Sequence, residues 1–166
     1  MNLGYSGSKK PLSYGFWDGK GKYDTAGIEE NLWHPLRSNP NAKLIIRLWI
    51  DTYPQWGFEN PDDVIQNGRG EKMIVSGHFL RFSNVPPVKP EQYAWSFLSK
   101  RFRKDTGDMV SAYIRAVEKT IPSRAIIGYF VGGGQDQQMY HWHAPDDFLS
   151  KDPYLWGDYS PVARTA

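Results

Sequence analysis

Two apolar runs along the chain have the composition of buried β-strands, and each ends in a group of polar side chains. The first run, 43–51, leads into Thr52–Trp56, and the second, 124–131, leads into three glycines followed by Gln135. Near-continuous β-type runs are typical of parallel strands that are covered on both faces. One such segment could also be an ordinary strand followed by a flexible turn. Because the same pattern occurs twice, we favour a site at the two strand ends.

An amphipathic helix is predicted between these two strands, over residues 96–121. Its apolar residues recur at helical spacing, its charged residues fall on the other face, and Pro122 ends it. Residues 43–51, 96–121 and 124–131 therefore form a strand–helix–strand unit, which requires parallel strands and a right-handed crossover. Ligands of such units bind beyond the carboxyl ends of the strands, where both polar groups lie.

The rest of the chain carries weaker patterns, and its 166 residues fit a single domain, 1–166. Residues 52–95 are expected to form one long connection, with a turn of helix starting at 60–63. A connection of this length in a compact domain is usually functional or poorly ordered. The other expectations are a loop over 1–23, a short helix from Asp24 or Thr25 to about Leu36, and a loop over 135–166.

The charge of the chain argues against two classes of partner. Its net charge is only +2, which is too small to indicate nucleic acid or a membrane surface. The dense basic run 100–104 lies inside the predicted helix and is expected to be a solvated face, because no motif for reading a nucleic-acid groove accompanies it. No apolar run approaches the roughly 20 residues of a membrane-spanning helix. We therefore expect neither nucleic acid nor a membrane as a partner.

No cofactor or metal is expected either. The chain has no Cys, which excludes disulfides and thiolate chemistry. The glycines 132–134 are not followed by the Lys-Ser/Thr pair of a phosphate loop, and they lack the spacing of a dinucleotide fingerprint. His141 and His143 point to one side of an extended chain, but no third metal ligand lies nearby.

Several short motifs occur in an order that is more specific than any one of them. They are Gly21–Asp24, Leu44–Trp56, Phe58–Asp63, Ser99–Glu118, Ile126–Gly133, Trp142 and Gly157–Pro161. Their order and spacing, over about residues 15–161, resemble the catalytic barrel of glycoside hydrolases of the β-galactosidase-like group, relatives of the family-42 enzymes. The resemblance implies an α/β fold, a partial (β/α)₈ barrel with parallel strands and long βα loops. It also implies that the chain is truncated after the fourth strand.

The chain departs from that group at the catalytic acid. Gln138 stands at the position that matches the acid/base glutamate of the group, and an amide cannot transfer a proton. Retaining hydrolysis needs two carboxyl groups about 5–5.5 Å apart, and the nucleophile of such barrels comes from a strand beyond this sequence. Asp136, two residues from Gln138, is the candidate to replace the acid. Its alternative role is to cap the turn of its own loop.

Six residues are candidates for binding a sugar at the strand ends. Aromatic side chains are abundant, with seven Trp, ten Tyr and eight Phe, and pyranose C–H faces stack on such rings. Trp56 and Trp142 are the expected platforms, although Trp56 has the alternative of packing under the long loop. Asp51 suits a sugar hydroxyl, or else a pair with Arg47 or a loop amide. The full set is Arg47, Asp51, Trp56, Gln135, His141 and Trp142.

The sequence therefore predicts a carbohydrate-active protein that resembles a glycoside hydrolase acting on β-linked oligo- or polysaccharides, with incomplete catalytic residues. Two alternatives stay open. One is a sugar-binding protein without activity, and the other is a barrel fragment that is inactive until it pairs with another chain. Because two or three barrel strands cannot close, unpaired edges and apolar faces also predict a homo-oligomer.

Overall fold

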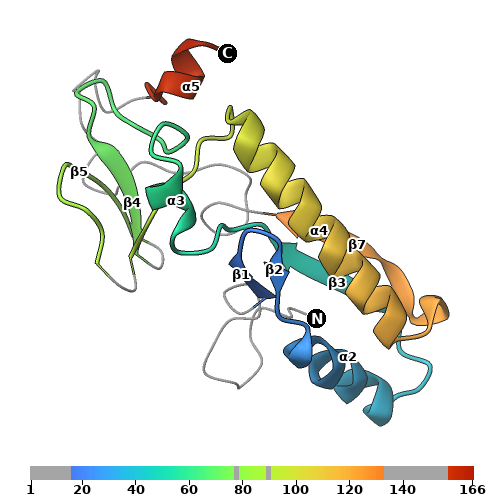
Figure 1. Cartoon of the computed structure of the whole chain (residues 1–166). Helices are drawn as coiled ribbons and strands as arrows, with labels where there is room; N and C mark the ends of the chain where they lie inside the picture. The colour runs from blue at the N-terminus through green and yellow to red at the C-terminus, as the bar shows by residue number, and fades with distance from the viewer. Residues whose placement is uncertain (1–15, 77–78, 89–90, 133–156) are drawn as a thin grey trace. The chain divides into compact units, whose positions relative to one another are not determined.

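The computed structural model describes residues 16–76, 79–88, 91–132 and 157–166 (Figure 1). The fold is mixed α/β and divides into two compact units, formed by 1–53 with 105–133 and by 54–104 with 134–166. None of the described helices is long and apolar enough to cross a membrane.

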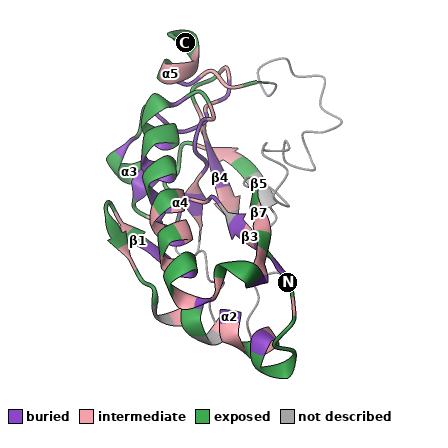
Figure 2. Cartoon of the chain, turned by 90° about the vertical axis from the view of Figure 1, so that its right-hand side faces the viewer, coloured by how far each residue is buried: buried purple, intermediate pink, exposed green. Residues whose placement is uncertain are grey.

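The predicted strand–helix–strand arrangement is present, and the first unit contains both strands and the helix from residue 105 onward. Strands β3 (Leu44–Trp49) and β7 (Ile126–Gly132) pair in parallel, with Ile46 opposite Tyr129. Helix α4 (Lys100–Thr120) joins them and runs beside the pair in Figures 1 and 2, followed by a 3₁₀ turn, η1 (Ser123–Ala125). The two strands and the helix between them are therefore confirmed, although α4 begins four residues later than predicted at 96. The strands are not covered on both faces as expected, because Ile45 is 52% exposed and Ile127 is 65% exposed.

Burial explains why these residues form the core of the first unit. On β3 alternate side chains, Leu44, Ile46 and Leu48, are buried, as the pleat of a strand with one covered face requires. The buried residues of α4 in this unit recur every three or four positions, and Figure 2 shows its exposed face in green. These helical core residues are Met109, Tyr113 and Val117.

Two further elements complete the first unit. Helix α2 (Ala26–Ser38) buries Ile28, Leu32 and Leu36, as the helical spacing predicted, and Thr25 occupies its N-cap position without a side-chain capping bond. Strands β1 (Trp17–Gly19) and β2 (Lys22–Tyr23) form a small antiparallel hairpin where a loop was expected. Gly21, at φ 69°, lies in the turn between them.

The second unit corrects the expectation of a long connection over 52–95. It contains a three-stranded antiparallel sheet in the order β5-β4-β6, preceded by the short helix α3 (Trp56–Glu59). The strands are β4 (Lys72–Ser76), β5 (Phe79–Ser83) and β6 (Gln92–Tyr93). Each is too short to show a clear hydrophobic period. Each also depends on tertiary pairing, since β4 pairs with β5 on one side and with β6 on the other, so local pattern did not reveal them.

Two smaller expectations also change in the second unit. Residues 60–63 do not start a helical turn, because Asn60 is the C-cap of α3 and its side-chain amide donates to the Trp56 carbonyl at 2.8 Å. A short helix, α5 (Pro161–Arg164), follows Ser160 within the predicted C-terminal loop. Among the described residues the parallel sheet has two strands and does not close into a barrel.

Candidate functional site

The carboxyl ends of β3 and β7 meet at one edge of the parallel pair. Trp49 lies opposite Gly132 in the register, and the amide of Ile50 donates to the carbonyl of Gly132 at 2.9 Å. Asp51, which is half-buried, therefore leaves the sheet at the same edge at which β7 leads into residue 133. The two strand ends therefore meet at one edge, as predicted, while the polar residues that follow β7 lie outside the described residues.

Most of the predicted site follows β7 directly. Gln135, Asp136, Gln138, His141 and Trp142 lie outside the described residues, so the catalytic and sugar-binding roles expected of them stay predictions. The described part of the predicted site consists of Arg47, Asp51 and Trp56.

Arg47 lies on β3 directly opposite Phe130 of β7. Its guanidinium carbon lies 5.5 Å from the centroid of the Phe130 ring, whose residue is 50% exposed. The Nε atom of Arg47 is buried and has no hydrogen-bond partner among the described residues. Within the described part of the chain, this half-buried cation lies against a ring and has no carboxylate partner. Its guanidinium carries several N–H donors that a polar ligand can use.

The structure does not support the platform role predicted for Trp56. The residue is 0% exposed, and its ring meets the ring of Phe102 edge-on at a centroid distance of 6.0 Å. Stacking on a sugar requires an accessible ring face, and Trp56 presents none in this structure. Packing, the alternative left open for this residue, describes its environment: it begins α3 and belongs to the core of the second unit.

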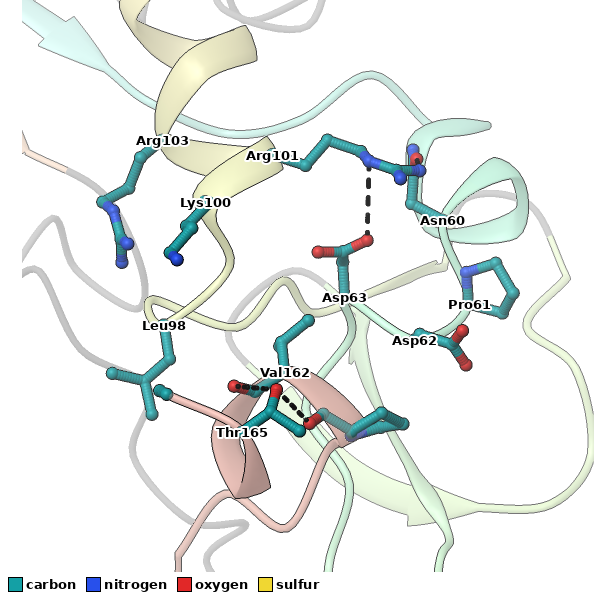
Figure 3. A pocket seen from close by; sticks show the side chains of 12 residues that line it. Asn60, Pro61, Asp62, Asp63, Leu98, Lys100, Arg101, Arg103, Val162 and Thr165 are labelled. Atoms are coloured by element: carbon teal, nitrogen blue, oxygen red, sulfur yellow. Dashed lines mark hydrogen bonds and ion pairs between the residues drawn. The ribbon is translucent and has the colours of Figure 1, made fainter.

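The second unit contains a surface cavity of about 800 Å³ that sequence reasoning missed (Figure 3). Three segments line it: residues 60–63 after α3, the start of α4 with the residue Leu98 before it, and α5. Its charged lining residues are Asp62, Asp63, Lys100, Arg101 and Arg103.

A hydrogen-bonded cap fixes the start of α4 at this cavity. The Ser99 hydroxyl accepts from the amide of Phe102 at 2.8 Å and donates to the carboxylate of Asp63 at 2.5 Å. Capping of the third helical amide by a serine is the usual N-terminal arrangement. The cap also orients Asp63, whose other oxygen lies 3.7 Å from Nε of Arg101. Arg101 in turn donates to the side-chain oxygen of Asn60 at 2.5 Å.

A second set of bonds holds α5. The Ser96 hydroxyl donates to Asp158 at 2.5 Å, and the other carboxylate oxygen of Asp158 accepts from the Ser160 amide at 2.9 Å. Ser160 then caps α5 by accepting from the amide of Ala163 at 3.4 Å.

One signal in the sequence pointed to this cavity. Ser99 directly precedes the basic run 100–104, and a serine at the N-cap places those cations in the first turn of a helix.

The chemistry available at the two places differs. The strand ends offer Asp51 and Arg47 for polar recognition, whereas the cavity offers cationic groups beside apolar walls. Among the described residues, no group of three or more His, Asp or Glu side chains lies close enough to hold a metal ion.

Comparison with known proteins assigns no family to this chain. No protein-family model, no curated protein and no solved structure matches it.

Proposed function

We propose that this chain is a carbohydrate-directed protein that acts on or binds β-linked oligo- or polysaccharides at the carboxyl ends of β3 and β7. The observation that carries the proposal is the bond from the Ile50 amide to the Gly132 carbonyl, which joins the two strand ends at 2.9 Å. It supports a common exit for the segment of Asp51 and the segment that continues to Gln138. A glycosidase-like βαβ unit requires this arrangement.

The finer part of the proposal follows the resemblance to β-galactosidase-like hydrolases. The β3–α4–β7 unit corresponds to one repeat of a partial (β/α)₈ barrel, and Gln138 takes the place of the acid/base glutamate. Asp51 and Arg47 bind sugar hydroxyl groups at the strand ends, together with Gln135, His141 and Trp142. The parallel register of β3 and β7 supports this assignment, because neighbouring strands of such barrels are parallel.

Binding without turnover is the second candidate, and the identity of Gln138 favours it. An amide hydrogen-bonds a glycosidic oxygen, but it does not protonate the leaving group. General acid assistance is typically worth about 10²–10⁴ in rate, so cleavage of unactivated glycosides is expected to be very slow. Activated aryl glycosides depend less on the acid, and they react only if a carboxylate supplies the nucleophile.

Restoring the carboxyl group distinguishes the two candidates. Gln138→Glu is expected to raise the rate on unactivated xylo-, cello- or galacto-oligosaccharides, whereas Gln137→Glu, a matched control one residue away, is expected to leave it unchanged. Asp136→Asn tests the alternative acid: if Asp136 has taken over the role, the unmodified chain cleaves oligosaccharides with a bell-shaped pH profile that this variant abolishes.

Binding is measured in parallel by titrating tryptophan fluorescence with the same oligosaccharides. Saturable binding without cleavage in every variant supports a sugar-binding protein, and loss of that binding in Trp142→Ala supports the platform role of Trp142. An absence of both cleavage and saturable binding, in all variants and with all three sugars, would refute the proposed function.

A further inference from the structure

The cavity of the second unit combines a cationic wall with an apolar wall. In Figure 3, Lys100 and Arg103 extend from the start of α4 on one side, and Asp62 lies on the opposite side of the cavity. Leu98, Pro161 and Val162 supply apolar lining, and Leu98 is 44% exposed. All twelve lining residues belong to the second unit and to the described part of the chain.

The cations of this wall are only partly neutralised. Asp63 is committed to Ser99 and Arg101, and its side chain is 9% exposed. Arg103 donates one N–H to the carbonyl of Phe97 at 2.8 Å, and its other donors have no partner within the described ranges. Among the described residues, the ammonium group of Lys100 has no hydrogen-bond or ion-pair partner. The side of the cavity that carries Lys100 and Arg103 therefore has an excess of positive charge.

The position of these cations is unfavourable for the helix itself. The first turn of α4 contains no acidic residue, although acidic residues are favoured at the positive end of a helix and basic ones are not. Lys100, an exposed cation at that position, has no partner among the described residues and indicates a role other than stabilising the helix, because residue choices that oppose the local structure concentrate at functional sites. An anion in the cavity would offset the positive charge of these side chains and of the helix end.

The walls are also held in place before any ligand arrives. Ser96 precedes the cationic wall and bonds to Asp158, which positions Ser160 at the start of α5. Ser96 and Ser160 are both completely buried. A preformed cavity avoids part of the ordering cost of binding, since the groups that line it need not be immobilised by the ligand.

We propose that this cavity binds the acid group of an anionic saccharide, either a uronate carboxylate or a sugar sulfate. Lys100 and Arg103 hold the oxyanion, because the planar guanidinium matches two oxygens of such a group and the ammonium adds a mobile point charge. Leu98 and Val162 face the C–H surface of the sugar ring. The anionic group is inferred from the cavity alone, whereas the saccharide that carries it rests on the proposed function.

The test compares acidic oligosaccharides with neutral ones by calorimetry at low salt. The ligands are an oligogalacturonate, its fully methyl-esterified form, a sulfated oligosaccharide, inorganic sulfate, and a single-stranded oligonucleotide of similar charge. The variants are Lys100→Gln with Arg103→Gln, and as a matched control Lys119→Gln, which removes an exposed cation near the other end of α4. Thermal unfolding of each variant verifies that it folds.

The expected result is saturable binding of at least one acidic oligosaccharide that weakens at least about tenfold in the double variant and less than about twofold in Lys119→Gln. The methyl ester is expected to bind at least about tenfold more weakly than the free acid, and added salt is expected to weaken the binding of the acid. Chemical-shift changes at Lys100 and Arg103 would locate the ligand.

Three outcomes would overturn the proposal in different ways. If acidic and neutral sugars bind equally well, and the double variant binds them as the unmodified chain does, the cavity is not the binding site. The proposed function is then unaffected. If inorganic sulfate binds at Lys100 and Arg103 but no sugar binds, the cavity is an anion site and the proposal of a saccharide ligand is wrong. Tighter binding of the oligonucleotide than of every sugar assigns the cations to a nucleic acid instead.

Discussion

The hydroxyl group of Ser99 bonds both to the amide of Phe102 and to the carboxylate of Asp63, so a single side chain joins the start of α4 to the segment after α3. Ser99 is completely buried, and Asp63 is 6% exposed. Removal of this hydroxyl would leave a buried carboxylate oxygen and a helix amide without their partner. A buried polar group that loses its partner costs more free energy than the hydrogen bond contributes to stability when it is made.

We therefore expect Ser99→Ala to lower the free energy of unfolding by about 1–3 kcal/mol, from the loss of the cap and of the bond to Asp63. Urea denaturation provides the measurement. Ser111→Ala is the matched control, because Ser111 is exposed within the same helix, and it is expected to change stability by less than about 0.5 kcal/mol. Equal effects of the two substitutions would contradict the structural role of Ser99.

A second prediction concerns the contact between Ser96 and Asp158, which are 62 positions apart in the sequence. If this bond holds the start of α5, then Ser96→Ala and Asp158→Asn are not additive. A double-mutant cycle is expected to give a coupling free energy of about 0.5–3 kcal/mol, as is usual for groups in direct contact. A coupling below about 0.3 kcal/mol would show that Asp158 does not depend on Ser96 in solution.

The sequence predicted the first unit better than the second, for physical reasons that particular elements illustrate. Strand β3 is a run of apolar residues long enough to show its type, and α4 has 21 residues over which helical spacing is unambiguous. Strand β6 has only two residues, and it exists because it pairs with β4. Pairing between distant segments is a tertiary effect that local propensity does not contain.

The described site residues show the same difference between what local sequence predicts and what tertiary contacts decide. Arg47 was expected to bind a sugar or to pair with Asp51, and the structure places it against the ring of Phe130, a neighbour set by the register of β7. Trp56 was expected at a ligand because it follows a strand, yet its ring is buried and packs against Phe102, which is distant in the sequence. The cationic cavity was missed because its second wall, α5, lies about sixty positions from the first.

The third prediction is a loss of stability at high pH that depends on Tyr113. Burial, and in smaller part the charge of Tyr129, raises the pKa of Tyr113 from 10.0 to about 12. The unfolded chain therefore releases this proton near pH 10, before the folded chain does, so stability is complete below pH 10 and falls as the pH rises to about 12. The loss attributable to Tyr113 is expected to be about 2–3 kcal/mol.

Urea denaturation of the unmodified chain and of Tyr113→Phe between pH 9 and pH 12 measures this effect. The variant lacks the ionisable hydroxyl, so its free energy of unfolding is expected to fall less steeply over this interval, while the ionisation of other groups affects both proteins alike. Parallel pH profiles in the two proteins would show that Tyr113 ionises as readily in the folded chain as in the unfolded one.

The last prediction is self-association through the parallel pair. Parallel strands are normally covered on both faces and extended by further strands, whereas among the described residues β3 and β7 pair only with each other. Ile45 is 52% exposed and Phe130 is 50% exposed, and they lie on one face because Gly128, the partner of Ile45, is two residues before Phe130. A second copy of the chain would cover this apolar face and the unpaired edges.

Size exclusion with light scattering is therefore expected to show a mass that rises with protein concentration. Combining Ile45→Thr with Phe130→Thr places β-branched side chains, which strands favour, at both positions but removes apolar area, and it is expected to shift the protein toward the monomer. The matched control combines Val85→Thr with Val88→Thr, two residues that are 68% and 72% exposed outside the strands, and it is expected to associate like the unmodified chain. A monomer at every concentration tested would refute association, and an equal shift in both variants would place it elsewhere on the molecule.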